Sequence, residues 1–506
     1  MSSSTYGLLG FILPLCAFFA KPLSCSITDA RGIHKQFLIG SLSVILMSYT
    51  GLGILAFVKD PEDHDHDTIA WIVICVCMIC GSTASACVFC MNDALASNYA
   101  RKNNKSYSLM RIWGNIGWAA GPITVLMIGN VSWLPFRTPG IILLVLATGI
   151  DVLLLSLWPY DEDFVMFHDG STIEQRKLSM VGPNTMAYLR QNKPRGSVSR
   201  DMLEKIRTGR SKSVGNLPRM DGQLRSLDFS QAPQKVEEKE MKEYSNAQCQ
   251  LILLKMIATG HKSFFRFISL FITFGFIQGF FWNFQMDYVD KRITKGDQEQ
   301  FETMANLCMI AQAFLGEIPI NALATHMIRL FGTNANLSLA LVAIGLRCFF
   351  YIQFLPYLPR MWILFAEALS GPSLGLYWIL IVDVGSNYAL MVNEFMPEMK
   401  RRGIVRSRAH EEELNGCLRA TMIGAMSSSM EGLGVASGAL IGGYVTSSVG
   451  YDFMWNFCAY LGIIVGLSNL FIDVFNKLIL KKQKKKKDPS SMAIPVVRIE
   501  SIDSKL

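Results

Sequence analysis

Charged residues are scarce in this chain. Asp, Glu, Lys and Arg together supply 17% of its 506 residues, whereas 51% are hydrophobic, and the mean hydropathy is +0.29. A soluble globular chain carries more charge than this. The net charge of +8 comes largely from loops and from the C-terminal tail, so it indicates membrane orientation and not nucleic-acid binding.

The sequence also lacks the arrangements that catalysis or metal binding would need. It contains no recognisable nucleophile–base set and no phosphate-binding loop, which argues against an enzyme. Most of the 12 cysteines lie in apolar segments, and the C-x-x-C of Cys77 and Cys80 has no second Cys or His pair to complete a site. We therefore expect no metal and no cofactor, and interpret the cysteines as small residues of an apolar core.

Long apolar segments take the place of charge. Eleven of them reach about 20 residues, the length that a helix needs to cross a bilayer. They are continuous apolar blocks without period-2 alternation, which favours spanning helices. The sequence thus predicts an all-α membrane protein of about eleven transmembrane helices. The predicted spans are 6–24, 37–58, 69–92, 108–129, 139–158, 264–286, 304–328, 336–355, 361–385, 418–445 and 453–476.

A polar stretch divides these spans into five plus six. Residues 1–158 form the predicted N-terminal transmembrane bundle, 159–262 a cytoplasmic loop, 263–476 the C-terminal bundle and 477–506 a basic cytoplasmic tail. Lys and Arg concentrate in alternate loops and in the tail, and short cytoplasmic loops retain such residues. The C-terminus is therefore expected inside and the N-terminus outside, with the plasma membrane favoured over an internal one.

The loop and the tail carry further expectations. The middle of the loop is basic, rich in Ser and poor in aromatics, so we expect it to be disordered. Near its end, 236–256 has apolar residues at helical spacing and predicts an amphipathic helix on the cytoplasmic face. The lysine run at 481–487 would attract anionic lipid headgroups, or alternatively serve only as a stop signal after the last span.

One span carries an unusual glycine pattern. Gly114, Gly117 and Gly121 recur at spacings of three and four, which would let a neighbouring helix approach to backbone contact. Gly434, Gly438 and Gly442 recur at a spacing of four near the end of the chain. We interpret this second set as a packing ridge.

The same first span carries a charge. Arg111 stands at its cytoplasmic end, and Trp118, two turns further on, offers an aromatic plane beside the guanidinium. A basic group next to an aromatic face is a common way to hold a polar ring or an anion. Asp93, near the cytoplasmic end of the preceding span, is the natural partner for Arg111.

The layout of two plus three spans, a loop and six spans resembles the major facilitator superfamily. The turn from Cys25 to Gly32 is similar to the signature loop of that family between its helices two and three, with Cys25 and Ala30 replacing the usual Gly and Arg. The resemblance implies two bundles that rock around a central site, with Asp29 and Gly32 as gating residues. On this alignment the first helix of the family is absent.

Within the superfamily, the spacing of Asp93, Arg111 and Trp118 resembles the lactose permease branch of oligosaccharide/proton symporters. There an acid lies eighteen residues before the Arg and a Trp seven after it. The resemblance implies that the acid and the Arg bind sugar hydroxyls and that the Trp stacks on the ring. Glu317 resembles the helix-eight carboxylate of that family and Arg347 its helix-nine Arg.

Proton coupling is the point of departure from that branch. Its helix-ten His and Glu are absent here, and Glu367 is the nearest substitute. Glu317 is the leading candidate for a proton-carrying carboxylate that pairs with Arg347. The alternative is that Glu317 and Arg347 form a purely structural pair, because a buried charge needs a partner whatever its function.

The chain resembles, over nearly its whole length, the animal family called major facilitator superfamily domain-containing protein 6. The short sequence segments that carry this resemblance begin at Tyr6, Arg111, Gly316 and Leu418. We expect a secondary active transporter that moves a small polar solute by alternating access, with protons as candidate coupling ions. The alternative is a non-transporting cell-surface receptor on the same scaffold. Lys21, Asp151 and Glu431 also lie within predicted spans, where each has both a structural and a functional interpretation.

Overall fold

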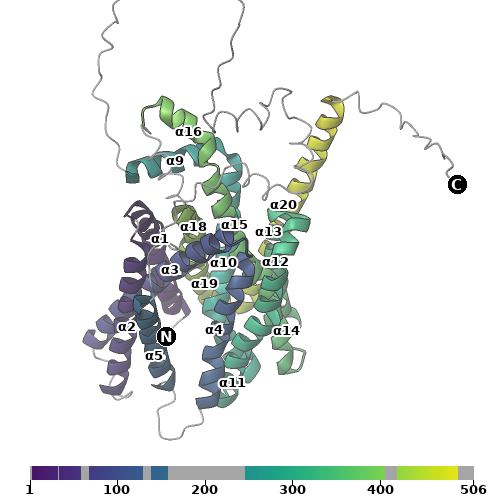
Figure 1. Ribbon diagram of the computed structural model, residues 1–506. Helices are drawn as coiled ribbons and strands as arrows, with labels where there is room; N and C mark the ends of the chain where they lie inside the picture. The colour runs from purple at the N-terminus through teal and green to yellow at the C-terminus, as the bar shows by residue number, and fades with distance from the viewer. Residues whose placement is uncertain are drawn as a thin grey trace, which may run out of the picture. The chain divides into compact units, whose positions relative to one another are not determined.

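The computed structural model describes residues 3–31, 33–58, 68–128, 138–157, 246–404 and 419–487, which all belong to one compact unit. Every regular element in these ranges is a helix (Figure 1). The N-terminal half consists of α1 (Ser3–Arg31), α2 (His34–Val58), α3 (Thr68–Lys102), α4 (Tyr107–Ile128) and α5 (Thr138–Leu157).

The C-terminal half contains α-helices interrupted by short π-helical and 3-10 segments, which carry the label η. Such π-helical segments occur frequently at functional sites. In chain order the elements are α9 (Asn246–Gly260), α10 (Lys262–Tyr288), η2 (Val289–Thr294), α11 (Gln298–Ala311), η3 (Gln312–Glu317), α12 (Ile318–Phe331), α13 (Thr333–Gln353), η4 (Arg360–Trp362), α14 (Ile363–Ala368), η5 (Gly371–Gly375), α15 (Leu376–Leu390), α16 (Val392–Arg401), α18 (Arg419–Ser428), η6 (Ser429–Val435), α19 (Ala436–Ser448) and α20 (Tyr451–Lys487).

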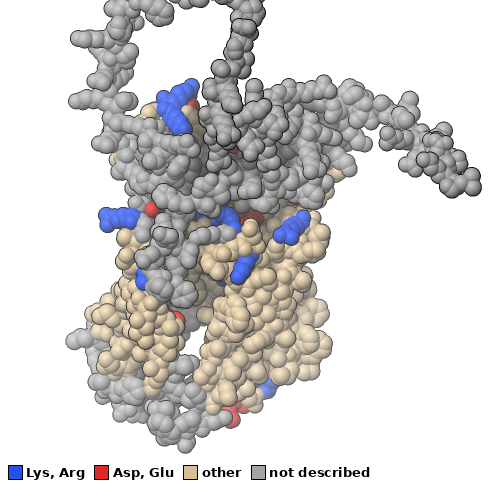
Figure 2. Space-filling model, viewed as in Figure 1, with Lys and Arg blue, Asp and Glu red and all other residues tan. Residues whose placement is uncertain are grey.

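The helices have the length and composition of membrane spans. Eight helical segments of the described part are long and apolar enough to cross a bilayer. Most of the described surface visible in Figure 2 carries neither Lys, Arg, Asp nor Glu. The protein is therefore an integral, multi-pass membrane protein. The eight segments are Gly10–Asp29, His34–Leu55, Ile72–Arg101, Ser263–Thr294, Gln298–Phe331, Thr333–Gln353, Arg360–Leu390 and Tyr451–Ile479.

Helices also occupy the three other predicted spans, as α4, α5 and the continuous run α18–η6–α19. The count of eleven and the division into five plus six stay predictions. The last helix runs through the lysine run to Lys487, beyond the predicted end of the span at residue 476.

Two helices of the N-terminal half pack along helices of the C-terminal half. Helix α1 contacts α18, η6 and α19, and α4 contacts α11, η3 and α12 (Figure 1). The first contact is very close: a Cβ added at Gly7 would lie 2.7 Å from the carbonyl oxygen of Ala439. The contacts of α1 form a seam that brings Lys21 and Asp29 against η6 and α18.

The two glycine patterns have different outcomes. The ridge of Gly434, Gly438 and Gly442 packs against α10 as predicted, and a Cβ at Gly438 would lie 2.0 Å from the carbonyl oxygen of Phe276. At Gly114, Gly117 and Gly121 the prediction of close helix approach is wrong. An added Cβ at any of them meets no described atom within 4 Å, because α4 turns this face away from its neighbours.

Helix α9, Asn246–Gly260, overlaps the amphipathic helix predicted at 236–256, of which 236–245 lie outside the described residues. Cys249, Leu253 and Ile257 recur at every fourth residue and are fully buried, so the helix has one packed face. It contacts α16, α10 and α1. Its place on the cytoplasmic face stays a prediction, and the middle of the predicted loop lies outside the described residues.

Candidate functional site

A partly buried acid–base cluster links α3 and α4. The Arg111 guanidinium donates from Nη1 to Oδ1 of Asp93 at 2.7 Å, and the hydroxyl of Tyr107 donates to the same oxygen at 2.6 Å. Arg111 and Tyr107 also lie 3.0 Å apart, one helical turn from each other on α4. The predicted partnership of Asp93 and Arg111 is thus present, and Tyr107 is a third member that the spacing argument did not include.

The aromatic ring over Arg111 comes from the other half of the chain. Its guanidinium carbon lies 5.0 Å from the ring centroid of Trp378 on α15, within the range of a cation–π contact. Trp118, which the sequence placed beside this guanidinium, is 56% exposed instead. Seven residues along a helix turn through about 700°, which leaves a side chain near the same face but two turns away. Trp378 therefore takes the position that we predicted for Trp118.

A second buried cluster lies within the C-terminal half. Arg347 on α13 forms an ion pair with Glu367 on α14, and both side chains are almost fully buried. The carboxylate of Glu367 also accepts hydrogen bonds from the Tyr351 hydroxyl and, at 2.9 Å, from the Gln285 amide. The ring of Tyr351 is fixed in turn by stacking on Trp455, with centroids 5.0 Å apart and planes 7° from parallel.

The predicted pairing of Glu317 with Arg347 is therefore wrong. Glu317 ends η3, is 8% exposed and accepts a hydrogen bond from the Gln312 amide at 3.0 Å. Arg347 pairs instead with Glu367, which lies twenty residues further along the chain and could not be chosen over Glu317 from spacing. Arg111 and Arg347 both act electrostatically on Glu317, so this carboxylate is within electrostatic reach of both clusters.

The predicted gate residue Asp29 joins the two halves. Its Oδ2 accepts hydrogen bonds from the backbone N–H and the hydroxyl of Thr421, both at 3.0 Å, and its Oδ1 lies 3.1 Å from His34 Nε2. Asp29 thereby satisfies an N–H near the start of α18, where helices leave such donors unpaired. Gly32, the other predicted gate residue, lies outside the described residues.

Arg419 is an inter-half contact that the sequence analysis missed. Its guanidinium donates to Asn98 at 2.7 Å and to Ser97 at 2.8 Å on α3, and to Ser386 on α15. It stands two residues before Thr421, so the same end of α18 holds both α1 and α3. A lone Arg at the start of a predicted span was the available signal.

Several buried polar atoms of these clusters have no hydrogen-bond partner among the described residues. They include Nε of Arg111, Nε and Nη1 of Arg347 and the amide nitrogen of Asn115. Buried polar atoms are normally satisfied, so unpaired donors are informative. These atoms are thus unpaired donors within a mostly apolar interior.

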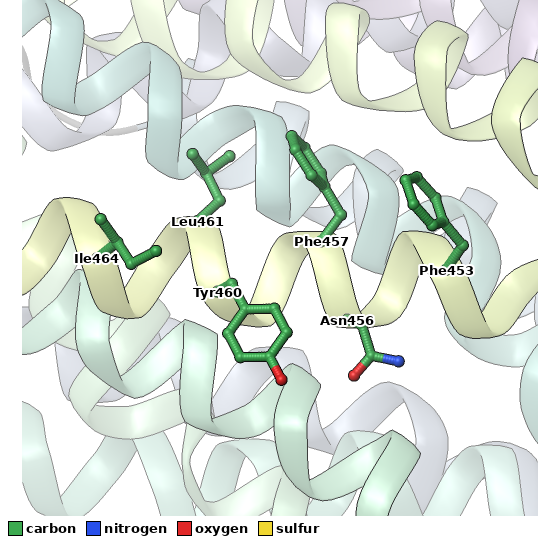
Figure 3. Close-up of a pocket in the computed structure, with 6 residues that line it drawn as sticks. All are labelled: Phe453, Asn456, Phe457, Tyr460, Leu461 and Ile464. Atoms are coloured by element: carbon green, nitrogen blue, oxygen red, sulfur yellow. The ribbon is translucent and has the colours of Figure 1, made fainter.

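One surface hollow of the described residues lies along a single helix. It is a groove of about 550 Å³ along α20, lined by Phe453, Asn456, Phe457, Tyr460, Leu461 and Ile464 (Figure 3). All six residues come from one helix, and none is charged. An apolar groove on the outside of a membrane helix suits lipid chains better than a polar solute.

Several solved structures are similar to this chain. A point mutant of the nucleoside transporter NupG superposes with a TM-score of 0.51 at 12% identity over 93% of this chain and 91% of its own. The human organic anion transporter MFSD10 (TETRAN) gives 0.46 at 14% identity over 92% and 83%. The xylose transporter XylE from E. coli gives 0.48 at 14% identity over 92% and 87%. No curated protein sequence matches the chain. The model of the MFS_1 like family matches residues 1–393, and the chain belongs to this family of the major facilitator superfamily.

Proposed function

We propose that the protein is a secondary active transporter that moves a small polar solute by alternating access. One observation carries the proposal. Arg111 of the N-terminal half lies against Trp378 of the C-terminal half, with the buried carboxylate of Glu317 in electrostatic reach. Charges inside a membrane protein are costly and usually mark a solute or ion path. Transporters of repeated halves bind solute near the midplane, between the halves.

The chemistry of the cluster suggests the class of solute. A guanidinium with a free N–H and a nearby indole suit a planar polar ring or an anion, and the carboxylates of Asp93 and Glu317 accept from hydroxyl or amine donors. We assign solute binding to Asp93, Arg111, Trp118, Glu317 and Arg347. Trp378 joins this set because it, and not Trp118, covers Arg111.

Proton coupling is assigned to the two buried glutamates of the C-terminal half. Glu317 has one amide partner and two arginines in electrostatic reach, so its charge can respond to solute between the halves. Glu367 is already held by Arg347, Tyr351 and Gln285, so it is less free than Glu317 to change partners. Glu317 is therefore the leading proton carrier and Glu367 the second candidate.

The finer assignments complete the proposal. Asp29 gates the cytoplasmic side together with Gly32, three residues further along the chain, and the C-terminus is cytoplasmic. The plasma membrane is the proposed location, with anionic lipid headgroups at the lysine run. The sequence segments that begin at Tyr6, Arg111, Gly316 and Leu418 support membership of the major facilitator superfamily domain-containing protein 6 group. We assign no enzymatic activity.

The test is transport by the purified full-length chain in proteoliposomes. Labelled nucleosides, hexoses and organic anions are screened for uptake, first without and then with an imposed pH gradient. For a transported solute, Glu317→Gln should abolish pH-driven accumulation while leaving solute exchange. Retained accumulation in Glu317→Gln would remove the coupling role from this residue and transfer the test to Glu367→Gln.

A receptor on the same scaffold is the second candidate. Its support is that Arg347 is already neutralised by Glu367, and that the helix-ten His and Glu of the lactose permease branch are absent. The Arg111 cluster argues against this candidate, because a receptor needs no charged cluster between its halves. Folded protein that binds a solute in the screen but never moves it across the bilayer would favour this candidate.

A further inference from the structure

A buried ion pair joins the two halves outside the site described above. The ammonium of Lys21 on α1 pairs with the carboxylate of Glu431 in η6 and donates to the Ser427 hydroxyl on α18 at 3.0 Å. Lys21 is fully buried, and the Glu431 side chain is 17% exposed. No solute-binding or coupling role described above uses either residue.

The pair differs from the other buried pairs in where its partners come from. Asp93 and Arg111 both belong to the N-terminal half, and Arg347 and Glu367 both belong to the C-terminal half. Those pairs can survive a rigid movement of one half against the other. The pair of Lys21 and Glu431 must break if α1 moves away from η6.

The surroundings give the pair little alternative solvation. A Cβ at Gly432 would lie 2.3 Å from Cβ of Phe18, and one at Gly424 would lie 3.1 Å from Sγ of Cys25. Helix α10 presents Gly275 and Gly279 to η6 at similarly short range. From α3, the titratable side chain of Cys87 interacts electrostatically with both members of the pair. An ion separated from its partner here is therefore strongly disfavoured unless water enters or its charge is lost.

The backbone is also irregular at Glu431. Glu431 lies inside the π-helical segment η6, Ser429–Val435, which interrupts the α-helical run from α18 to α19. Such interruptions concentrate at functional sites. The Ser428 hydroxyl, three residues from Glu431, is buried without a partner among the described residues.

We propose that Glu431 is a proton-binding site of the transport cycle and that Lys21 controls it. With α1 against η6, the carboxylate is ionised and held by the ammonium. When a proton from the open side binds the carboxylate, Lys21 keeps only the Ser427 hydroxyl, so the seam opens and water reaches the ammonium. Release of the proton restores the carboxylate, and the ion pair closes the seam again. The role in a cycle rests on the proposed function, whereas the titration of the seam is a property of the protein alone.

The test is amide hydrogen exchange of the full-length protein in lipid nanodiscs, followed by mass spectrometry at several pH values and corrected for intrinsic exchange. Wild-type protein should show severalfold faster exchange in α1 and η6 as the pH falls. Glu431→Gln should show this fast exchange already at neutral pH and should lose the pH dependence. A wild-type pH dependence in Glu431→Gln would overturn the proposal.

Two further variants guard against misfolding. Glu431→Asp keeps a titratable group and should keep the pH dependence, and Lys21→Met combined with Glu431→Gln removes both charges and should fold without it. The measurement needs no solute. If solute is taken up but Glu431→Gln keeps the wild-type exchange in α1 and η6, only this inference fails. If exchange in α1 and η6 depends on pH but no solute is taken up, only the transport proposal is contradicted.

Discussion

Arg111 and Trp378 lie 267 residues apart in the chain, yet the guanidinium carbon of one is 5.0 Å from the ring centroid of the other. The contact crosses from α4 to α15, and the same guanidinium is held within its own half by Asp93 and Tyr107. Arg111 is thus the point where a charged cluster of the N-terminal half meets an aromatic ring of the C-terminal half.

Replacement of Trp378 tests this contact. Trp378→Ala should weaken the apparent affinity for a transported solute by roughly tenfold, or about 1.4 kcal/mol, because Arg111 loses a cation–π partner. Trp378→Phe should retain part of the affinity. Trp118→Ala is the comparison variant and should lose less affinity than Trp378→Ala, since the Trp118 ring is 56% exposed. A larger loss of affinity in Trp118→Ala than in Trp378→Ala would restore the sequence-based assignment.

Removal of Glu367 should be far more damaging than removal of an exposed glutamate. Glu367→Gln leaves Arg347 buried without a counter-ion, which should lower the free energy of unfolding by about 3–5 kcal/mol. The measurement is unfolding of the purified protein in detergent. Arg347→Met combined with Glu367→Gln should recover much of this loss.

Glu398 on α16 supplies the matched control for Glu367. Arg401 and Arg402 hold the pKa of the Glu398 carboxyl below its usual range. Its ion pairs therefore persist above that pKa and are lost as the pH falls through it. Because the pairs are exposed to solvent, Glu398→Gln should change stability little. If Glu367→Gln and Glu398→Gln lower the free energy of unfolding equally, the pair of Arg347 and Glu367 is not a buried contact.

The contact of Asp29 with Thr421 should hold α1 to α18. Asp29→Ala leaves a buried backbone N–H and a hydroxyl unpaired, at a cost of about 1–3 kcal/mol. Amide exchange at the start of α18 should therefore accelerate in this variant. The control is Asp151→Asn, which changes an exposed acid on α5 and should leave exchange at α18 unchanged. Unchanged exchange at α18 in Asp29→Ala would show that this contact does not join the halves.

The two glycine patterns should respond to alanine in opposite directions. Gly438→Ala puts a methyl group 2.0 Å from the Phe276 carbonyl oxygen, and such overpacking should destabilise the protein by about 1–3 kcal/mol. Gly117→Ala meets no described atom within 4 Å and should stabilise α4 by up to about 1 kcal/mol through helix propensity. Thermal unfolding of the two variants checks both signs, and destabilisation by Gly117→Ala would mean that this face is packed.

The sequence was informative where the bilayer imposes a rule. Continuous apolar runs located the helices, because a spanning segment must satisfy its backbone internally. Asp93 was correctly paired with Arg111 because few other carboxylates were available near that membrane depth. Fourfold spacing predicted the ridge at Gly438 because a helix repeats its face nearly every four residues.

The sequence does not predict which of several chemically similar residues pair when the partners lie far apart in the chain. Arg347 had two carboxylates to choose from, and only packing of α13 against α14 selects Glu367. Trp378 and Lys21 found partners in the other half of the chain, which no local spacing encodes. The π-helical segments that carry Glu317 and Glu431 were likewise unpredictable, because an extra residue in a turn leaves the hydrophobic pattern almost unchanged.

Uptake by proteoliposomes that contain Arg111→Gln is the decisive test of transport through the Arg111 cluster. Arg266→Gln is the matched control, because Arg266 is also a half-buried arginine but binds Asn469 within the C-terminal half. We expect the wild-type protein and Arg266→Gln to take up at least one of the labelled nucleosides, hexoses or organic anions, whereas folded Arg111→Gln should take up none. Uptake by Arg111→Gln at the wild-type rate would show that the cluster has no part in transport.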